Sequence, residues 1–351
     1  MKKNSSDPRA DPLARPTTKD LAKFAGVSRA TVDRVLNGRE GVKQKTIDRV
    51  NAAIKELGFV RNLSAANLAR NKSYRFVFVL PRSGDLFHRE IVRHIDEANS
   101  ILVNDMVTTH VEHLDENDPH GIAAYLATLT TDTVDGVAIM APETPQVRDA
   151  IHRLQERGVR TLPFISNQTG TGSDWVGIDN NAAGATAATL LGRFVRAETG
   201  SILIVSETMQ SRDSLERRLG FDRIINSRFP HLHALPSLET YGSPDRARTI
   251  MSEALKRPDI VAAYILSSEA RVPLTVLNGI GLPQPIVTIA HERTPYTESA
   301  LKSGLLDALI TQDPGHLARS AIRKLKAMTD QRSTLFSQEK IRVEILLATN
   351  L

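Results

Sequence analysis

Residues 17–38 of the chain read "TTKDLAKFAGVSRATVDRVLNG". Thr17 is followed three residues later by Asp20, a capping-box spacing that predicts the start of a short helix. Gly26 ends this helix, and Ser28 is placed to cap a second one. The second helix has an apolar inward face, yet it presents charged side chains outward. Two short helices joined by a tight glycine-containing turn predict a helix-turn-helix unit.

The flanking sequence extends this unit to a small three-helix domain. A third helix is expected over residues 44–57, because apolar residues recur there on one helical face and Gly58 follows as a stop signal. Residues 1–15 are polar, interrupted by proline and without periodicity, so we expect a disordered leader. The predicted helix-turn-helix domain therefore covers residues 16–61.

Charge is distributed unevenly along the chain. Residues 1–75 hold 17 Lys and Arg against 7 Asp and Glu, a net charge of +10, whereas residues 76–351 carry a net charge of −5. A basic head on a mildly acidic body suits nucleic-acid binding, because phosphate contacts supply most of the non-specific affinity for DNA. A solvated basic tail is the alternative interpretation of the charge alone.

The spacing A-x-x-A-G-V-S-x-x-T-V-x-R-x-x-N occupies residues 22–37, and "VKQKTIDRVNAAIKELGFVRNLSAANLA" follows at residues 42–69. This sequence resembles the DNA-binding head of the lactose-repressor (LacI/GalR) family of transcription regulators. The resemblance implies that the second helix enters the major groove of operator DNA. It also implies a hinge at residues 62–72 that becomes helical only on DNA. Such a short segment is not a stable helix in isolation, so a partner has to hold it.

Three positions of the second helix match family positions that face base edges: Arg29, Ala30 and Arg34. Arginine suits this place because its planar fork donates two hydrogen bonds to guanine, worth about 1–3 kcal/mol of discrimination. Asp33 departs from the family, which commonly carries a small hydroxyl residue there. Asp33 either accepts a hydrogen bond from cytosine N4 or holds the fork of Arg29, four residues earlier, in place; we favour the second role.

Other positions match family residues that fix the protein on the DNA. Hydroxyl and amide side chains are suited to phosphate contacts, which set the register without reading the sequence. These positions are Thr17, Ser28, Thr31 and Asn37. Thr31 alternatively packs and caps its helix. In the hinge, Asn62 is expected to contact DNA, and Leu68 matches the leucine that the family wedges between base pairs in the minor groove.

From Ser73 onward the pattern changes to alternating strands and helices. Continuous apolar runs such as "YRFVFVLP" are typical of strands buried on both faces of a parallel sheet. A first series of strands is expected at residues 74–81, 106–111, 134–141 and 160–166, with helices near 119–130 and 144–157. A second series is expected at residues 200–206, 232–238, 260–267, 285–290 and 306–313, with helices from about 182 and at 213–227, 244–256, 270–280 and 297–303. Two doubly wound halves predict two lobes.

The predicted fold class is an all-α helix-turn-helix head followed by an α/β core with doubly wound parallel sheets. This core resembles the two-lobed, periplasmic-binding-protein-like core of the same family. It is expected to cover residues 73–351, with chain crossings near 175–181 and 311–316 and a return strand within 341–351. The N-terminal lobe then holds residues 73–175 and 313–335, and the C-terminal lobe holds residues 180–311 and 338–351.

Ligands of such two-lobed folds bind at the carboxyl ends of the strands, between the lobes. This geometry and the resemblance nominate effector-binding residues: Asp85, Phe87, Ser166, Asn167, Arg217, Glu269, Glu292 and Gln312. Arg217 stands three residues before Gly220 in "SLERRLGF", as does the arginine that reaches the effector in the family. Carboxylates, an arginine fork and an aromatic side chain together suit a hydroxyl-rich small molecule such as a sugar.

Two departures from the family leave the identity of the effector open. Phe164 stands where the best-known sugar-binding members have an acid, and "AHER" at residues 290–293 replaces a more usual glycine-tyrosine-aspartate. Trp175, the one tryptophan of the chain, is either a packing residue at the lobe crossing or a platform for the ligand.

The sequence argues against several other function classes. The chain contains no cysteine, which rules out disulfides, thiolate metal sites and cysteine nucleophiles. It has no GxxxxGK[ST], no GxSxG and no recognisable pair of catalytic acids, so we expect no enzyme activity, no catalytic residue and no cofactor. "HVEH" at residues 110–113 lacks a third ligand at metal spacing, so we expect an exposed strand end rather than a metal site.

These observations together predict a cytoplasmic transcriptional regulator, in the first place a repressor, controlled by a small-molecule effector. We expect no membrane partner, since the sequence has no signal-peptide run and no apolar stretch of membrane-spanning length. The expected partners are a pseudo-palindromic operator duplex, a sugar-like effector and a second copy of the chain, because one head contacts only a half-site. No heptad tail follows the last strand, so a homodimer is expected. The alternative is a cytoplasmic solute-binding or sugar-processing protein without specific operator binding.

Overall fold

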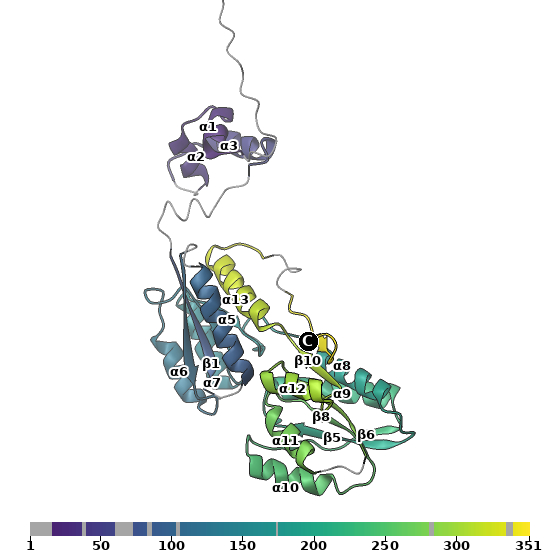
Figure 1. Ribbon diagram of the computed structural model, residues 1–351. Helices are drawn as coiled ribbons and strands as arrows, with labels where there is room; N and C mark the ends of the chain where they lie inside the picture. The colour runs from purple at the N-terminus through teal and green to yellow at the C-terminus, as the bar shows by residue number, and fades with distance from the viewer. Residues whose placement is uncertain are drawn as a thin grey trace, which may run out of the picture. The chain divides into compact units, whose positions relative to one another are not determined.

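The computed structural model describes residues 16–36, 40–59, 73–82, 86–102, 106–172, 175–280, 284–334 and 340–351 (Figure 1). Contacts between Cα atoms divide the chain into two compact units, Met1–Lys72 and Ser73–Leu351.

In its described residues, 16–36 and 40–59, the first unit contains three helices: α1 (Thr18–Phe24), α2 (Arg29–Leu36) and α3 (Gln44–Glu56). The predicted capping box is confirmed at α1, where the Thr17 hydroxyl accepts a hydrogen bond from the Asp20 amide and the Asp20 carboxylate accepts one from the Thr17 amide. Gly26 separates α1 from α2 with a φ of 60°, in the left-handed region that glycine adopts without strain. The predicted helix-turn-helix and third helix are both present.

The three helices share one small core. Leu21 of α1, Val32 of α2 and Val50 of α3 are fully buried in the same hydrophobic cluster. The faces turned away from this core are mostly polar and exposed, although Phe24 of α1 is 51% exposed.

The second unit begins with a four-stranded parallel sheet in the order β2-β1-β3-β4. Its strands are β1 (Tyr74–Pro81), β2 (Val107–Leu114), β3 (Gly136–Ile139) and β4 (Arg160–Pro163). One face is covered by α5 (Leu86–Leu102) and α13 (Pro314–Thr329), and the other by α6 (Pro119–Thr128) and α7 (Pro145–Glu156) (Figure 1). We call this sheet with its helices the N-terminal lobe.

A second sheet has the order β11-β10-β9-β8-β5-β6, with the short β7 paired to β5. Its strands are β5 (Gly200–Ser206), β6 (Leu232–Ala234), β7 (Leu238–Glu239), β8 (Ile260–Ile265), β9 (Val287–His291), β10 (Ala308–Thr311) and β11 (Glu344–Leu346). All pairs are parallel except β10 with β11. One face carries α8 (Asn180–Phe194) and α9 (Arg212–Arg228), and the other carries α10 (Pro244–Ala254), α11 (Arg271–Ile280) and α12 (Pro295–Ser303). We call this sheet with its helices the C-terminal lobe.

The buried strands confirm the prediction of doubly wound parallel sheets. Along β5, Ile202 and Ile204 pack in the hydrophobic cluster of α8 and α9, whereas Leu203 and Val205 pack in that of α10, α11 and α12. Both sides of the strand are therefore apolar, which is why it reads as a continuous apolar run.

Each lobe is built from separate stretches of the chain. Phe164 pairs with Val176 in an isolated bridge beside β4, and α8 then begins the C-terminal lobe. After β10, α13 packs against β1, β3 and β4 of the N-terminal sheet, and β11 returns to pair with β10. The loops that follow the parallel strands are the places where side chains of different elements meet.

Candidate functional site

α2 presents an exposed polar face in the first unit. Arg29, Ala30, Asp33 and Arg34 are all exposed. The first three of them line a shallow surface hollow together with Thr18 of α1. A face with two arginines and small neighbouring side chains is able to donate hydrogen bonds to the edges of nucleic-acid bases.

Ser28 fixes the start of α2. Its hydroxyl oxygen accepts a hydrogen bond from the Thr31 amide at 3.1 Å, and the hydroxyls of the two residues lie 2.9 Å apart. Thr31 therefore takes part in the cap. The cap holds the first turn of α2, so that Arg29 and Ala30 leave the helix in a defined direction.

Several nominated positions lie outside the described residues. These are Asn37, Asn62, Leu68 and Asp85, together with the predicted leader and hinge. Their roles stay predictions.

A buried polar cluster lies at the carboxyl ends of the strands of the C-terminal sheet. Arg217 of α9 donates through Nε to Oδ1 of Asn180 at 2.8 Å and through Nη2 to Oε1 of Glu292 at 2.9 Å. Its Nη1 donates to the carbonyl of Leu266, just after β8, at 2.9 Å. Gln312, which follows β10, donates to the same Oε1 of Glu292 at 3.1 Å. We call Asn180, Arg217, Glu292 and Gln312 the polar cluster.

The polar cluster combines a buried ion pair with two amides. None of its four residues is more than 3% exposed. A buried ion pair is stabilising only when its remaining donors and acceptors also form hydrogen bonds. The oxygens of Asn180 and Leu266 accept such bonds from the guanidinium of Arg217. The amide oxygen of Gln312 is buried without a hydrogen-bond partner. The cluster therefore offers a buried acceptor next to a neutralised charge pair.

Glu292 has a strained backbone. Its φ is 64°, in the left-handed region that costs a non-glycine residue about 1–3 kcal/mol. Its amide donates to the Ile310 carbonyl at 2.8 Å, and its carbonyl accepts the hydroxyl of Thr297 at 3.0 Å. These bonds and the contact with Arg217 hold a conformation that directs the carboxylate into the cluster.

Two glycines bring α8 and α9 together so closely that Arg217 reaches Asn180. A Cβ atom on Gly184 of α8 would lie 1.8 Å from the carbonyl oxygen of Arg217, and one on Gly220 of α9 would lie 2.0 Å from that of Asn181. Both neighbours are backbone atoms, which cannot yield without moving a helix. The glycine in "SLERRLGF" thus has a packing reason to follow Arg217 by three residues.

A buried aromatic group packs behind the cluster. The rings of Phe221 and Tyr264 are stacked with centroids 4.5 Å apart, and the Tyr264 hydroxyl lies 2.7 Å from Nε2 of His291. Burial, together with the positive charge of Arg217, holds the pKa of His291 well below its usual range. Burial also raises the pKa of Tyr264 above its ordinary value. Both side chains are therefore neutral at physiological pH.

The structure brings only part of the nominated set together. Arg217, Glu292 and Gln312 meet in the polar cluster. Phe87 instead lies in the hydrophobic core and is 2% exposed, while Ser166 and Asn167 are half-buried in the loop after β4. Glu269 accepts the Arg271 amide at 2.9 Å and thereby caps the start of α11.

Sequence reasoning missed two features of the site. Asn180 was missed because it opens a helix and does not follow a strand; the polar run "IDNN" after the lobe crossing is the signal that was available. Gln168 was missed as well. It is 3% exposed, its amide nitrogen donates to the Ala141 carbonyl at 2.6 Å, and its amide oxygen has no hydrogen-bond partner.

An ion pair also joins the two lobes. Nη1 of Arg212, the first residue of α9, bonds to Oε2 of Glu143 in the loop after β3, and Nε of Arg212 bonds to Oε1 of Glu216 at 2.7 Å. Burial opposes the charged form of Arg212, but the hydrogen bonds to the two carboxylates prevail and raise the pKa of the guanidinium. No sequence pattern pairs Glu143 with Arg212, because they lie 69 residues apart.

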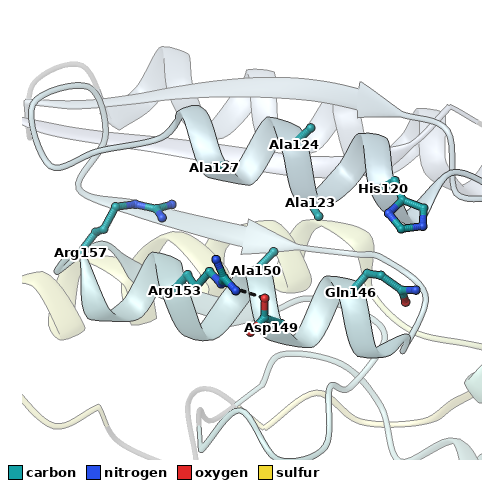
Figure 2. A pocket seen from close by; sticks show the side chains of 9 residues that line it. All are labelled: His120, Ala123, Ala124, Ala127, Gln146, Asp149, Ala150, Arg153 and Arg157. Carbon is teal, nitrogen blue, oxygen red and sulfur yellow. Dashed lines mark ion pairs between the residues drawn. The ribbon is translucent and has the colours of Figure 1, made fainter.

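Figure 2 shows a different hollow, between α6 and α7 of the N-terminal lobe. Four alanines are among its lining residues, and its charged residues already have partners: Arg153 pairs with Asp149 at 2.8 Å, and Arg157 donates to the carbonyls of Leu126 and Leu129. It contains none of the nominated residues.

Within the described ranges, no helix is long and apolar enough to span a membrane. The same ranges contain no group of three or more potential metal-binding side chains. His110 and Glu112 of "HVEH" lie on β2, with Nε2 and Oε2 3.6 Å apart.

Comparison with known proteins gives two family matches. Residues 17–62 match the model described as "Bacterial regulatory proteins, lacI family", and residues 76–333 match the model described as "Periplasmic binding protein domain". The first match covers the described helices of the first unit, and the second covers most of both lobes.

Individual proteins agree with these matches. The chain is 24% identical to the sucrose operon repressor of Streptococcus mutans over 80% of its own length and 83% of the repressor. It is 35% identical to the HTH-type transcriptional regulator RegA of Clostridium saccharobutylicum, over only 39% of each chain. The fold is similar to that of a solute-binding protein from Burkholderia graminis solved in complex with D-arabinose, with a TM-score of 0.70, 20% identity, and coverage of 80% of this chain and 96% of that one.

The family matches, the helices described in the head and the two doubly wound lobes lead to one conclusion. Residues 17–62 form a DNA-binding domain of the lacI family of bacterial regulatory proteins, residues 76–333 belong to the periplasmic binding protein domain family, and the chain is a transcriptional regulator, not an enzyme.

Proposed function

We propose that the protein represses transcription by binding an operator through the exposed face of α2, and that a small-molecule effector at the polar cluster controls this binding. The observation that carries the proposal is that one chain contains both a lacI-type head and a core in which a buried ion pair and two amides meet at the carboxyl ends of the strands. A solute-binding protein does not need the lacI-type head, and a DNA-binding protein without an effector does not need the polar cluster.

Arg29, Ala30 and Arg34 are the residues proposed to read base edges. Their exposure and the cap at Ser28 support this role, since a fixed first turn aims the side chains. Thr17 and Ser28 are proposed to contact phosphates: Ser28 has a hydroxyl able to donate, whereas the amide and hydroxyl of Thr17 both donate to Oδ2 of Asp20 and have to exchange this partner for a phosphate oxygen. Asn37, Asn62 and Leu68 complete the proposed DNA contacts.

The proposed effector is a sugar or another hydroxyl-rich molecule. Arg217 is already neutralised by Glu292, so the cluster does not need an anionic ligand, and the buried amide oxygen of Gln312 calls for a hydrogen-bond donor. Two similar proteins point the same way: one is named for a sucrose operon, and the other was solved with D-arabinose. Ser166, Asn167, Glu269, Phe87 and Asp85 stay candidates for the rest of the site.

The proposed mechanism is a shift between two arrangements of the lobes. An effector that contacts both lobes favours one arrangement by as much as it binds that arrangement more tightly. Because β1 follows directly on the predicted hinge, a change at the N-terminal lobe alters how the two hinges of a homodimer meet the operator. We place this homodimer in the cytoplasm, where the operator is.

The DNA-binding half is tested by selecting duplexes from a random pool with the full-length protein. A regulator yields a pseudo-palindromic consensus, because two identical heads bind two half-sites. A pool that stays random after selection would contradict operator recognition and favour a solute-binding protein.

The effector half is tested by thermal unfolding of the full-length protein against sugars, sugar acids, polyols and nucleobases. A ligand at 100 times its dissociation constant stabilises the folded state by about 2.7 kcal/mol. The ligand that stabilises the wild type should not stabilise an Arg217→Met variant. Equal stabilisation of both proteins would place the effector elsewhere.

A further inference from the structure

We propose that Arg212, Glu143 and Glu216 form a latch that holds the two lobes of the core in the arrangement that the structure shows, which we call closed. The latch adds a regulatory element to the proposed function. It rests on that function in one respect, because closure of the lobes is taken to control the response to the effector. The closure itself is a property of the core and needs neither DNA nor effector.

The N-terminal half of the latch consists of two loops tied to each other. Glu143 follows β3, and its Oε1 accepts the amide of Thr169, in the loop after β4, at 3.0 Å. Its other oxygen, Oε2, is the one that bonds to Nη1 of Arg212. Nη1 also lies 3.4 Å from the Thr169 hydroxyl. Arg212 thus contacts both N-terminal loops at once.

The C-terminal half of the latch belongs to the helix that carries the polar cluster. Arg212 and Glu216 lie one turn apart at the start of α9, and Arg217 follows directly. A movement of the N-terminal loops against Arg212 is therefore transmitted to the element that positions Arg217. The latch connects the lobes at a place where the chain itself does not cross between them.

Partial burial makes this ion pair sensitive to lobe opening. The side chains of Arg212, Glu143 and Glu216 are 25%, 19% and 29% exposed, so water screens them less than it screens a surface pair. When the lobes separate, Arg212 keeps Glu216, because both lie on α9. Glu143 instead loses its cation and keeps only the Thr169 amide. The closed arrangement is thus favoured by one interlobe charge pair that opening breaks.

The test measures the distance between the lobes directly in the full-length protein. The chain has no cysteine, so Glu156→Cys on α7 and Asn226→Cys on α9, both at exposed positions, allow two spin labels to be attached selectively. Pulsed electron paramagnetic resonance of labelled chains diluted with unlabelled chains then gives the populations of closed and open lobes.

Glu143→Gln and Arg212→Gln are each expected to lower the ratio of closed to open lobes by roughly threefold to tenfold. The double variant should resemble either single variant, because both remove the same interaction. High ionic strength should shift the wild type in the same direction and should leave Glu143→Gln unchanged.

Asp222→Asn is the matched control. Asp222 pairs with Arg218 at 2.8 Å on the same helix and with the same spacing as Glu216 and Arg212, but within one lobe. It should leave the distances unchanged. The latch is refuted if Glu143→Gln gives the wild-type distribution, or if Asp222→Asn shifts it equally. Since no operator or effector is present, these results stand whether or not the chain recognises an operator.

Discussion

At the scale of single residues, Arg217 and Glu292 place opposite charges where water does not reach. Their side chains are 3% and 1% exposed, with 2.9 Å between Nη2 and Oε1. Removing one partner leaves the other as an uncompensated buried charge, so Glu292→Gln should lower the free energy of unfolding by about 3–5 kcal/mol in urea titrations. Adding Arg217→Met should recover part of the loss. Glu253→Gln, in an exposed pair with Lys256, is the control with little effect.

His291 makes a second prediction at this scale. The unfolded chain binds a proton at this histidine below about pH 6.5, whereas the folded chain, in which the pKa of His291 is lowered, does not. The free energy of unfolding should therefore fall on acidification, by up to about 1.4 kcal/mol per pH unit from this residue. His291→Gln should flatten the dependence between about pH 5 and 6.5. The same slope in the wild type and in His291→Gln would remove His291 from the explanation.

Arg29 and Asp33 make the third prediction. Arg29→Ala should relax base preference at one operator position, a loss of about 1–3 kcal/mol of discrimination visible in a binding-site selection. Asp33→Asn separates the two roles left open for this carboxylate. If Asp33 holds Arg29, the same position relaxes; if it accepts from cytosine, a different one does. A consensus unchanged by both substitutions would exclude this face from base reading.

At the scale of elements, the contact between α8 and α9 decides whether the polar cluster forms. Gly220→Ala would bring a Cβ atom to 2.0 Å from the Asn181 carbonyl, so the helices must separate, and the free energy of unfolding should fall by about 1–3 kcal/mol. Gly279→Ala on α11 is the matched control, because a Cβ there meets nothing within 4 Å; it should stabilise by about 0.5–1 kcal/mol. Equal destabilisation of the two variants would show that close packing is not the reason.

Most elements could be predicted from the sequence because their patterns are local. β1 and β5 match the expected runs residue for residue, since strands buried on both sides are apolar throughout. The strand expected at 232–238 is instead two short pieces, β6 and β7, separated where Pro236 lacks an amide to donate. The strand expected at 160–166 ends at Pro163, shortly before Ile165, whose φ is 62°.

The candidate site was only partly predictable, because some of its contacts are not local in the sequence. The sequence alone points to Arg217 through the motif "SLERRLGF", and to Glu292 and Gln312 because each lies at the end of a predicted strand. Asn180 enters the cluster only because Gly184 and Gly220 bring two helices together. The latch depends on loops of different lobes meeting, and no local pattern encodes that.

At the scale of the whole molecule, the proposed function joins a DNA-reading head to a ligand-responsive core. In this proposal the head reads the operator sequence, the predicted hinge and the dimer provide two-fold symmetry, and the lobes control the binding. Operator recognition, effector binding and lobe movement can each be absent without the others. Operator selection, effector screening and lobe distances therefore test them independently. Operator recognition decides whether the chain acts as a regulator, whereas the lobe distances can be interpreted without it.

Operator recognition is tested by measuring the affinity of the full-length protein for its selected operator and for a scrambled duplex of equal length over a range of salt concentrations. We expect the operator to be bound at least about 10³-fold more tightly, and both affinities to fall steeply with rising salt as counterions are released. Equal affinity for the two duplexes at every salt concentration would contradict operator recognition.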